Sequence, residues 1–183
     1  MRTARSYLAV LLVAVGLAVV VFLARRRGPI PPPTTITGTA APTPIPGQLV
    51  LFFPGDDSFL HRETREVPEI PAGNAARVRL VVEELAAGSR EGHAAALPWA
   101  AAVGAVFVDR EGNAYVDLSP PPPDAIEGTD TELAVAFATT NSVVANCPGI
   151  ERLQLLFGGQ QVATLGHLDF SRPLAPKLDL VAP

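Results

Sequence analysis

Histidines with nearby carboxylates are the residues of this sequence whose types could support chemistry. His61 and Glu63 are one residue apart in an expected strand, which places both side chains on the same face. Zinc deaminases use a His-x-Glu pair, but they also need a Pro-Cys-x-x-Cys segment, and the one cysteine here precedes a proline. We interpret the pair as part of a solvated edge strand, and we expect His93 to be exposed in its Gly- and Ala-rich loop.

A second candidate pair lies near the carboxyl end of the chain. His167 and Asp169 could act as a base and the carboxylate that orients it. A hydrolase also needs a nucleophile, and the sequence has no Gly-x-Ser-x-Gly elbow to supply one. Ser119 ends a strand ahead of a proline run, so its ordinary role is to stop that strand.

The remaining candidates also favour structural roles. Cys147 follows an expected helix, and because the helix dipole disfavours a thiolate at a carboxyl terminus, we expect a small buried hydrophobe. Gly158-Gly159 lacks the lysine of a phosphate loop and is typical of a turn. Asp56-Asp57 is not followed by the regular oxygen spacing of a calcium loop. The sequence therefore predicts no catalytic, metal-binding or cofactor-binding residue, no cofactor and no enzyme.

Charge is distributed unevenly along the 183 residues. Residues 1–27 contain five arginines and no acid, so residues 28–183 hold nine Lys and Arg against eighteen acids, a net charge near −9. A domain of this sign repels phosphate backbones, which excludes nucleic acid as a partner. A single cysteine also excludes an internal disulfide.

The amino-terminal region predicts a membrane anchor. Residues 1–6 are a short basic segment, and residues 7–24 form an apolar run followed by Arg25–Arg27. A helix of this length, about 27 Å, just spans a bilayer core with arginines at both ends. The alternative is a cleaved signal peptide, but Phe22 disrupts a small-residue cleavage site ending at Ala24. A lipid anchor is excluded because no cysteine lies near the end of the run.

The next segment, residues 25–47, joins the arginine cluster to a linker. Gly28–Gly47 contains seven prolines, five threonines and no charge. Such a composition favours an extended polyproline conformation and cannot form a core. We therefore interpret it as a spacer between the membrane and a folded domain.

The folded domain is built around a predicted hairpin at Val103–Ser119. Two β-branched and aromatic runs flank the polar turn at Asp109–Asn113, in which Gly112 can adopt a left-handed conformation. Alternation in the second run predicts one buried face, formed by Ala114, Val116 and Leu118. A hairpin with one apolar face requires other elements to cover it.

Two amphipathic segments are the expected cover. The first begins with Asn74 as its N-cap and ends at Gly88, with apolar residues at helical spacing at Val78, Val81, Val82 and Leu85. The second begins with a capping box formed by Thr129 and Glu132, carries an apolar stripe that includes Phe137, and ends near Asn146.

The other predicted strands complete the domain. They are Gln48–Phe53, Phe59–Val67, and a pair, Arg152–Phe157 and Gln161–Leu165, joined through Gly158-Gly159 as a hairpin. Residues 172–183 form a proline-containing tail. The order predicts an α+β fold, a mainly antiparallel sheet with two helices on one face, preceded by a single transmembrane helix and a Pro-rich linker.

Five short motifs, in this order, resemble the GerMN (Germane) domain family of sporulation and spore germination proteins. They are Phe52-Phe53-Pro54 followed by Arg65-Glu66-Val67, Tyr115–Ser119, Pro148–Leu156, Gly158-Gly159, and Gly166–Asp169. The resemblance covers residues 48–171. The sequence departs from the family pattern at Ser89, at Pro98–Ala101 and at Pro120–Pro123, all of which are expected to be loops.

The resemblance implies a non-catalytic domain outside the cytoplasmic membrane of a bacterium, acting through protein contacts in the cell envelope. It also implies that the amino terminus is inside, which the arginine count alone leaves open. The expected partners are the membrane, through one span, and an envelope protein or further copies of the chain. Two alternatives remain: a domain that binds or hydrolyses a wall polymer through His167, Asp169 or Glu63, and a purely structural spacer.

Overall fold

A computed structural model describes residues 47–183 of the chain. The predicted transmembrane helix at residues 7–24 lies outside the described residues, as does nearly all of the linker. Within residues 47–183, no helix has both the length and the apolar character needed to cross a bilayer.

The described residues combine helices with mostly antiparallel strand pairs, which confirms the α+β class. In chain order they are β1 (Gly47–Pro54), β2 (Leu60–Val67), α2 (Asn74–Ala86), β3 (Val103–Val108), β4 (Asn113–Leu118), α3 (Thr129–Leu133), the π-helical turn η1 (Ala134–Ala138), α4 (Thr139–Asn146), β5 (Arg152–Phe157), β6 (Thr164–Leu165), β7 (Leu168–Asp169) and the 3-10 helix η2 (Leu178–Leu180).

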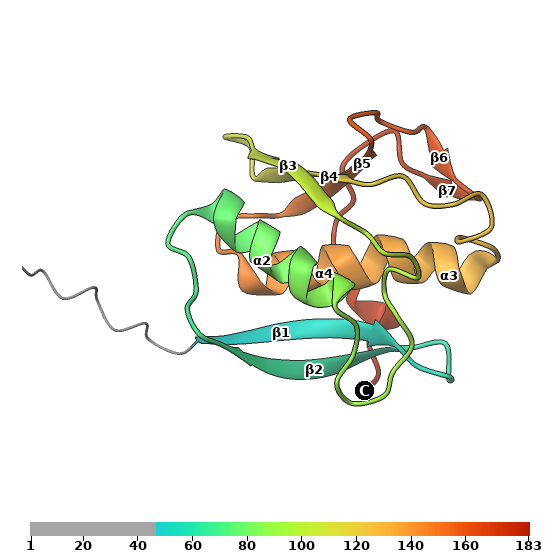
Figure 1. Cartoon of the computed structure of the whole chain (residues 1–183), viewed down its shortest axis with the longest axis horizontal. Coiled ribbons are helices and arrows are strands. Elements are labelled where there is room, and N and C mark those ends of the chain that lie inside the picture. The colour runs from blue at the N-terminus through green and yellow to red at the C-terminus, as the bar shows by residue number, and fades with distance from the viewer. Residues whose placement is uncertain (1–46) are drawn as a thin grey trace, which may run out of the picture. The chain divides into compact units, whose positions relative to one another are not determined.

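The helices lie between two sheets, as Figure 1 shows. Strands β1 and β2 form one antiparallel sheet, and β3, β4 and β5 form another. Helix α2 contacts β1 and β3, and α4 contacts β1 and β5. The prediction of one sheet with helices on one face is therefore wrong. A helix between two sheets is buried nearly all round, and residues 134–136 and 138–143 are all buried. The polar residues among them, 139–142, all take part in hydrogen bonds through their side chains.

The predicted hairpin and first helix are confirmed. Strands β3 and β4 pair antiparallel, and the turn glycine Gly112 has a φ of 82°. Ala114, Val116 and Leu118 are all buried in the core, as the alternation predicts. In α2, the four apolar residues of the predicted stripe are buried as well. The predicted N-cap is wrong by one position, because Gly73 precedes the helix and the Asn74 side chain instead donates to the Pro148 carbonyl.

The predicted capping box of the second helical segment is wrong. Gly128 precedes the helix, and no side chain caps its first turn. Glu132 is buried and accepts a hydrogen bond from the His167 backbone N–H at 2.8 Å, so its carboxylate is not available to the helix start. A π-helical turn, η1, interrupts the segment and shifts the side chains of α4 relative to those of α3. Phe137 is consequently only half-buried.

The predicted hairpin after β5 is also wrong. Strand β5 pairs parallel with β4, and β6 pairs with β7 instead of β5. The Gly158-Gly159 turn is present, but it returns the chain for only one bridge, between Phe157 and Gln160. The glycine pair is a local signal for a turn, and the turn is present. The parallel pairing of β5 with β4 joins segments that are distant in sequence, so local spacing gives no sign of it.

Helix α4 covers the outer edge of β1. The Asn146 side-chain amide accepts from the Val50 N–H at 2.9 Å and donates to the Val50 carbonyl at 2.7 Å. The Ser142 hydroxyl accepts from the Phe52 N–H at 2.9 Å. These polar side chains occupy the groups that a further strand would use, so this edge is closed to other chains.

Candidate functional site

Glu63, a candidate from the sequence, is part of a buried ionic network. Its carboxylate accepts from the Arg65 guanidinium, from the Ser89 hydroxyl at 2.7 Å and from the Arg90 N–H at 3.0 Å. Glu63 and Arg65 are each 2% exposed, so the prediction that Glu63 lies on a solvated edge is wrong. Burial raises the pKa of Glu63, but the hydrogen bonds from Arg65, Ser89 and Arg90 outweigh burial and leave its pKa below the ordinary value.

Arg65 joins this network to the carboxyl end of α2. Its guanidinium donates to the Glu84 carbonyl at 2.6 Å and to the Gly88 carbonyl at 2.8 Å, and it lies 3.1 Å from the Glu84 carboxylate. Helix α2 has no basic residue in its own last turn. Arg65 therefore supplies the cation that a helix carboxyl terminus favours, from a neighbouring strand. The network fixes β2, α2 and the loop after α2 together.

His61 lies on the same face of β2 but takes part in a different contact. Its Nε2 is 2.9 Å from the Asp57 carboxylate, and its ring stacks on that of His93 at 4.9 Å between centroids. The hydrogen bond with His61 holds the pKa of Asp57 below its ordinary value. His93 is half-buried rather than exposed, because it covers His61. Both imidazoles fasten the loop after α2 to the turn between β1 and β2.

The second candidate pair is separated in the structure. The His167 ring is 3.3 Å from the Glu132 carboxylate and is 86% exposed. Asp169 accepts from the Ser171 N–H and hydroxyl and lies 3.8 Å from Arg172. The Ser171 hydrogen bonds lower the pKa of Asp169. No hydrogen bond joins His167 to Asp169 among the described residues, so the base that a triad requires is not oriented.

Cys147 is buried, as the sequence predicts, and Ser119 holds a neighbouring loop. The Ser119 hydroxyl accepts from the Ala102 N–H at 3.0 Å and fixes the loop that enters β3. Cys147 is 1% exposed, and burial raises the pKa of its thiol to about 11. Among the described residues, neither side chain forms a hydrogen bond with a His, Asp or Glu. Residues 47–183 also hold no cluster of three or more His, Cys, Asp or Glu side chains that could bind a metal ion.

A surface cavity of about 520 Å³ is lined by two arginines. It lies over one end of β4 and β5, and the segment after β7 closes its other side. Arg152 and Arg172 both face it, together with Asn113, Tyr115 and Asp169. Burial and the hydrogen bond to Asp109 raise the pKa of Tyr115, which keeps its hydroxyl a donor. Because the Tyr115 hydroxyl and the Asn113 amide both donate to Asp109, the two guanidinium groups are the donors that suit a carboxylate-bearing ligand. Sequence reasoning missed this site because its residues are distant in the chain.

The Germane family model, described as sporulation and spore germination, matches residues 50–163. The chain belongs to the Germane family. The matched residues run from within β1 to just before β6, so they include the sheet of β3, β4 and β5, most of the β1–β2 sheet and both long helical segments. The resemblance inferred from the five motifs is confirmed.

Two solved structures of GerMN domains show the same fold. The first GerMN domain of the sporulation protein GerM from Bacillus subtilis is 15% identical, with a TM-score of 0.50 over 74% of this chain and 97% of that one. The tandem GerMN domains of the same protein are 17% identical, with a TM-score of 0.51 over 70% of this chain and 46% of that one. A Clostridium perfringens protein provisionally called a lipoprotein is 20% identical, with a TM-score of 0.47 over 72% and 87%. No curated protein matches this chain in sequence.

Proposed function

We propose that this Germane-family chain is a single-pass membrane protein with a non-catalytic domain outside the bacterial cytoplasmic membrane, where it makes protein contacts in the cell envelope. The observation that carries the proposal is the use of the candidate chemical groups as structural ties. Glu63 is committed to Arg65, His61 to Asp57, and His167 to Glu132. The apolar run at residues 7–24 and the proline-rich linker support the placement at the membrane.

Protease treatment of intact cells tests the placement. With the full chain expressed in its own cells, we expect external protease to remove the domain and spare a cytoplasmic control protein. A domain that is degraded only after cell lysis would contradict the proposal. Crosslinking in intact cells, followed by identification of the attached proteins, tests the contact role.

A second candidate function is recognition or hydrolysis of a wall polymer, and the cavity lined by Arg152 and Arg172 favours recognition. Alanine at Arg152 and Arg172 should abolish binding of carboxylate-bearing wall fragments if the cavity is their site. His167→Ala and Asp169→Ala address hydrolysis, because both side chains are exposed and their loss leaves the core intact. Glu63 is unsuitable for this test, since its replacement disrupts the buried network.

A further inference from the structure

The outer edges of the two larger sheets, β1–β2 and β3–β4–β5, are protected to different degrees. Helix α4 covers β1, as described above. Strand β5 exchanges two backbone hydrogen bonds with Leu174, at 2.9 and 2.8 Å. On β2, the Leu60 carbonyl accepts from the Ala182 N–H at 3.0 Å, and the exposed charges of Arg62 and Glu66 guard the remainder. Soluble proteins use such charges and covering segments to prevent further strand pairing.

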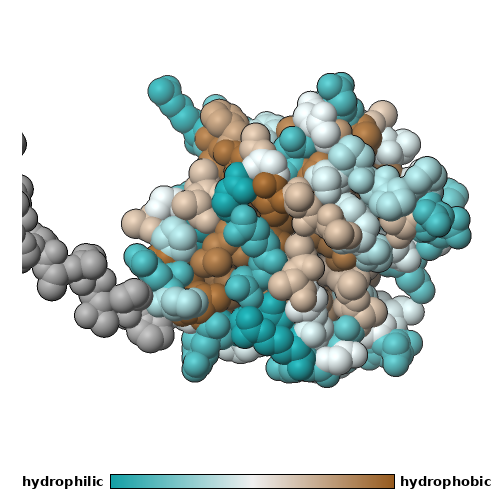
Figure 2. Space-filling model, viewed as in Figure 1, coloured by the Kyte–Doolittle hydropathy of each residue, from teal (hydrophilic) through white to brown (hydrophobic). Residues whose placement is uncertain are grey.

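Strand β3 is protected only over its first part, where a bulge interrupts its pairing with β4 between Val103 and Val106. Its six residues, Val103–Val108, carry no charge, and Phe107 is 63% exposed. Arg79 binds the carbonyls of Val103 and Gly104 and so covers only the first part of the edge. Figure 2 shows hydrophobic colours around this hairpin, beside its projecting hydrophilic tip. An uncharged open edge of this kind is a template for another strand.

The register of the hairpin determines which backbone groups this edge offers. The Asp109 N–H donates to the Asn113 carbonyl at 3.0 Å, so this pair is a hydrogen-bonded position of the ladder. Phe107 pairs with Tyr115 two residues earlier, so it is a hydrogen-bonded position as well. Because hydrogen-bonded and open positions alternate along an antiparallel strand, the N–H and carbonyl groups of Val106 and Val108 point away from β4. No backbone hydrogen bond to either valine from outside the hairpin occurs within residues 47–183.

We propose that β3 pairs with β3 of a second copy of this chain, antiparallel about a two-fold axis at Phe107. In this register Val106 lies opposite the partner's Val108, and Val108 lies opposite the partner's Val106. The two valines of each pair exchange both backbone N–H···O bonds. The two Phe107 rings then meet on one face, each beside its own Tyr115, whose ring centroid is 6.0 Å away. The proposal rests on the proposed contact function and names one partner for it.

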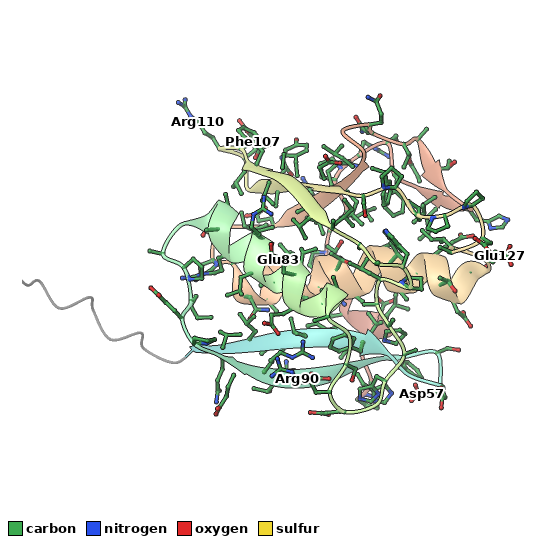
Figure 3. The ribbon with its side chains drawn as sticks, viewed as in Figure 1. Asp57, Glu83, Arg90, Phe107, Arg110 and Glu127 are labelled. Atoms are coloured by element: carbon green, nitrogen blue, oxygen red, sulfur yellow. The ribbon has the colours of Figure 1, made fainter. Side chains whose placement is uncertain are left out.

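Charge at the two ends of the strand fits the same arrangement. Arg110 follows β3 at the tip of the hairpin, and no described side chain forms an ion pair with it. Glu83 lies at the other end, 3.5 Å from the Arg79 that binds the start of β3. Figure 3 labels Phe107 and Arg110 on the hairpin and Glu83 on α2. Antiparallel pairing brings Arg110 to the end of the partner strand where the Glu83 carboxylate lies beside Arg79 and balances its charge.

A cysteine at the proposed axis tests the register directly. Directly opposed residues at an open position have Cα atoms about 4.5 Å apart, which a disulfide can bridge. We expect Phe107→Cys in the full chain, purified in mild detergent and oxidised, to give a disulfide-linked dimer on a non-reducing gel. Cys147 does not compete, because it is buried and its pKa is about 11. Leu178→Cys, at a residue 67% exposed, is the matched control for random collision.

Two further variants decide between outcomes. Thr64→Cys sits at the middle of the β2 edge, and a dimer that forms there and not at Phe107→Cys would overturn the proposal. Phe107→Lys should abolish concentration-dependent dimerisation of the otherwise native chain in sedimentation, whereas Thr64→Lys should not. Equal crosslinking of Phe107→Cys and Leu178→Cys would also refute self-pairing. If crosslinking in cells still yielded other envelope proteins, the contact function would stand without self-pairing.

Discussion

Replacing Arg65 by methionine is the sharpest stability prediction. The substitution keeps an apolar chain over the Phe53 ring, on which the guanidinium now lies at 5.6 Å, but removes the charge that pairs with Glu63. Removing one partner of a buried ion pair costs about 3–5 kcal/mol. Glu63 retains its hydrogen bonds from Ser89 and Arg90, so we expect the lower part of that range, about 3 kcal/mol.

Urea unfolding of residues 47–183, followed by circular dichroism, measures this loss. The matched control is Arg62→Met, on the exposed face of the same strand, which should change the free energy of unfolding by less than about 0.5 kcal/mol. Combining Arg65→Met with Glu63→Gln should cost less than the sum of the single changes, because no charge is then left unpaired. A loss at Arg65→Met no larger than that of the control would refute the role given to this network.

The remaining predictions concern the covered edge of β1, the start of α3, the Cys147 thiol and the effect of acid on Glu63. Asn146→Ala should cost about 1–3 kcal/mol in urea unfolding, because it leaves the Val50 backbone groups without partners; Ala145→Ser, at an exposed neighbour, is the control. Thr129→Ala should change the free energy of unfolding by less than about 0.5 kcal/mol, since its side chain makes no cap. A larger loss would show that Thr129 does cap the helix. Cys147 should react with a thiol reagent only on unfolding, so rapid labelling of the native chain would contradict its burial. Because the pKa of Glu63 is lowered in the folded state, its contribution is present above the unfolded value, near 4.3, and is lost as pH falls through the folded value; Glu63→Gln should weaken the acid dependence of the melting temperature.

Local spacing predicted the elements whose determinants are local. The alternation of Ala114, Val116 and Leu118 and the helical stripe of α2 both describe one buried face, and the structure buries those residues. The short family motifs also identified the family, although each is weak alone. The hairpin turn at Gly112 follows from the conformational freedom of glycine.

Long-range pairing could not be predicted in this way. The parallel contact of β5 with β4 and the position of the helices between two sheets depend on tertiary packing. Glu132 shows the same limit: three residues after Thr129 it satisfies the capping-box pattern, yet its carboxylate binds the His167 backbone 35 positions later. Tertiary hydrogen bonds overrode a local signal there.

The candidate site was affected by the same limit. His61 and Glu63 lie on one face of β2, as alternation requires, but Arg65 on that face and the loop after α2 convert Glu63 from a solvated group into a buried one. A basic residue two positions after an acidic one in a strand is the only sequence signal of this network. The open edge of β3 was visible only as an uncharged run, because the register that leaves Val106 and Val108 open is set by the turn.

The central claim is that the domain acts by contacting other proteins through accessible surface. Its most direct test is a photo-crosslinking amino acid placed at position 107 of the full chain in intact cells, with position 178 as the reference. The account predicts protein adducts at position 107 well above those at 178, formed with envelope proteins or with a second copy. Adducts no more abundant at 107 than at 178, or adducts only with cytoplasmic proteins, would contradict it.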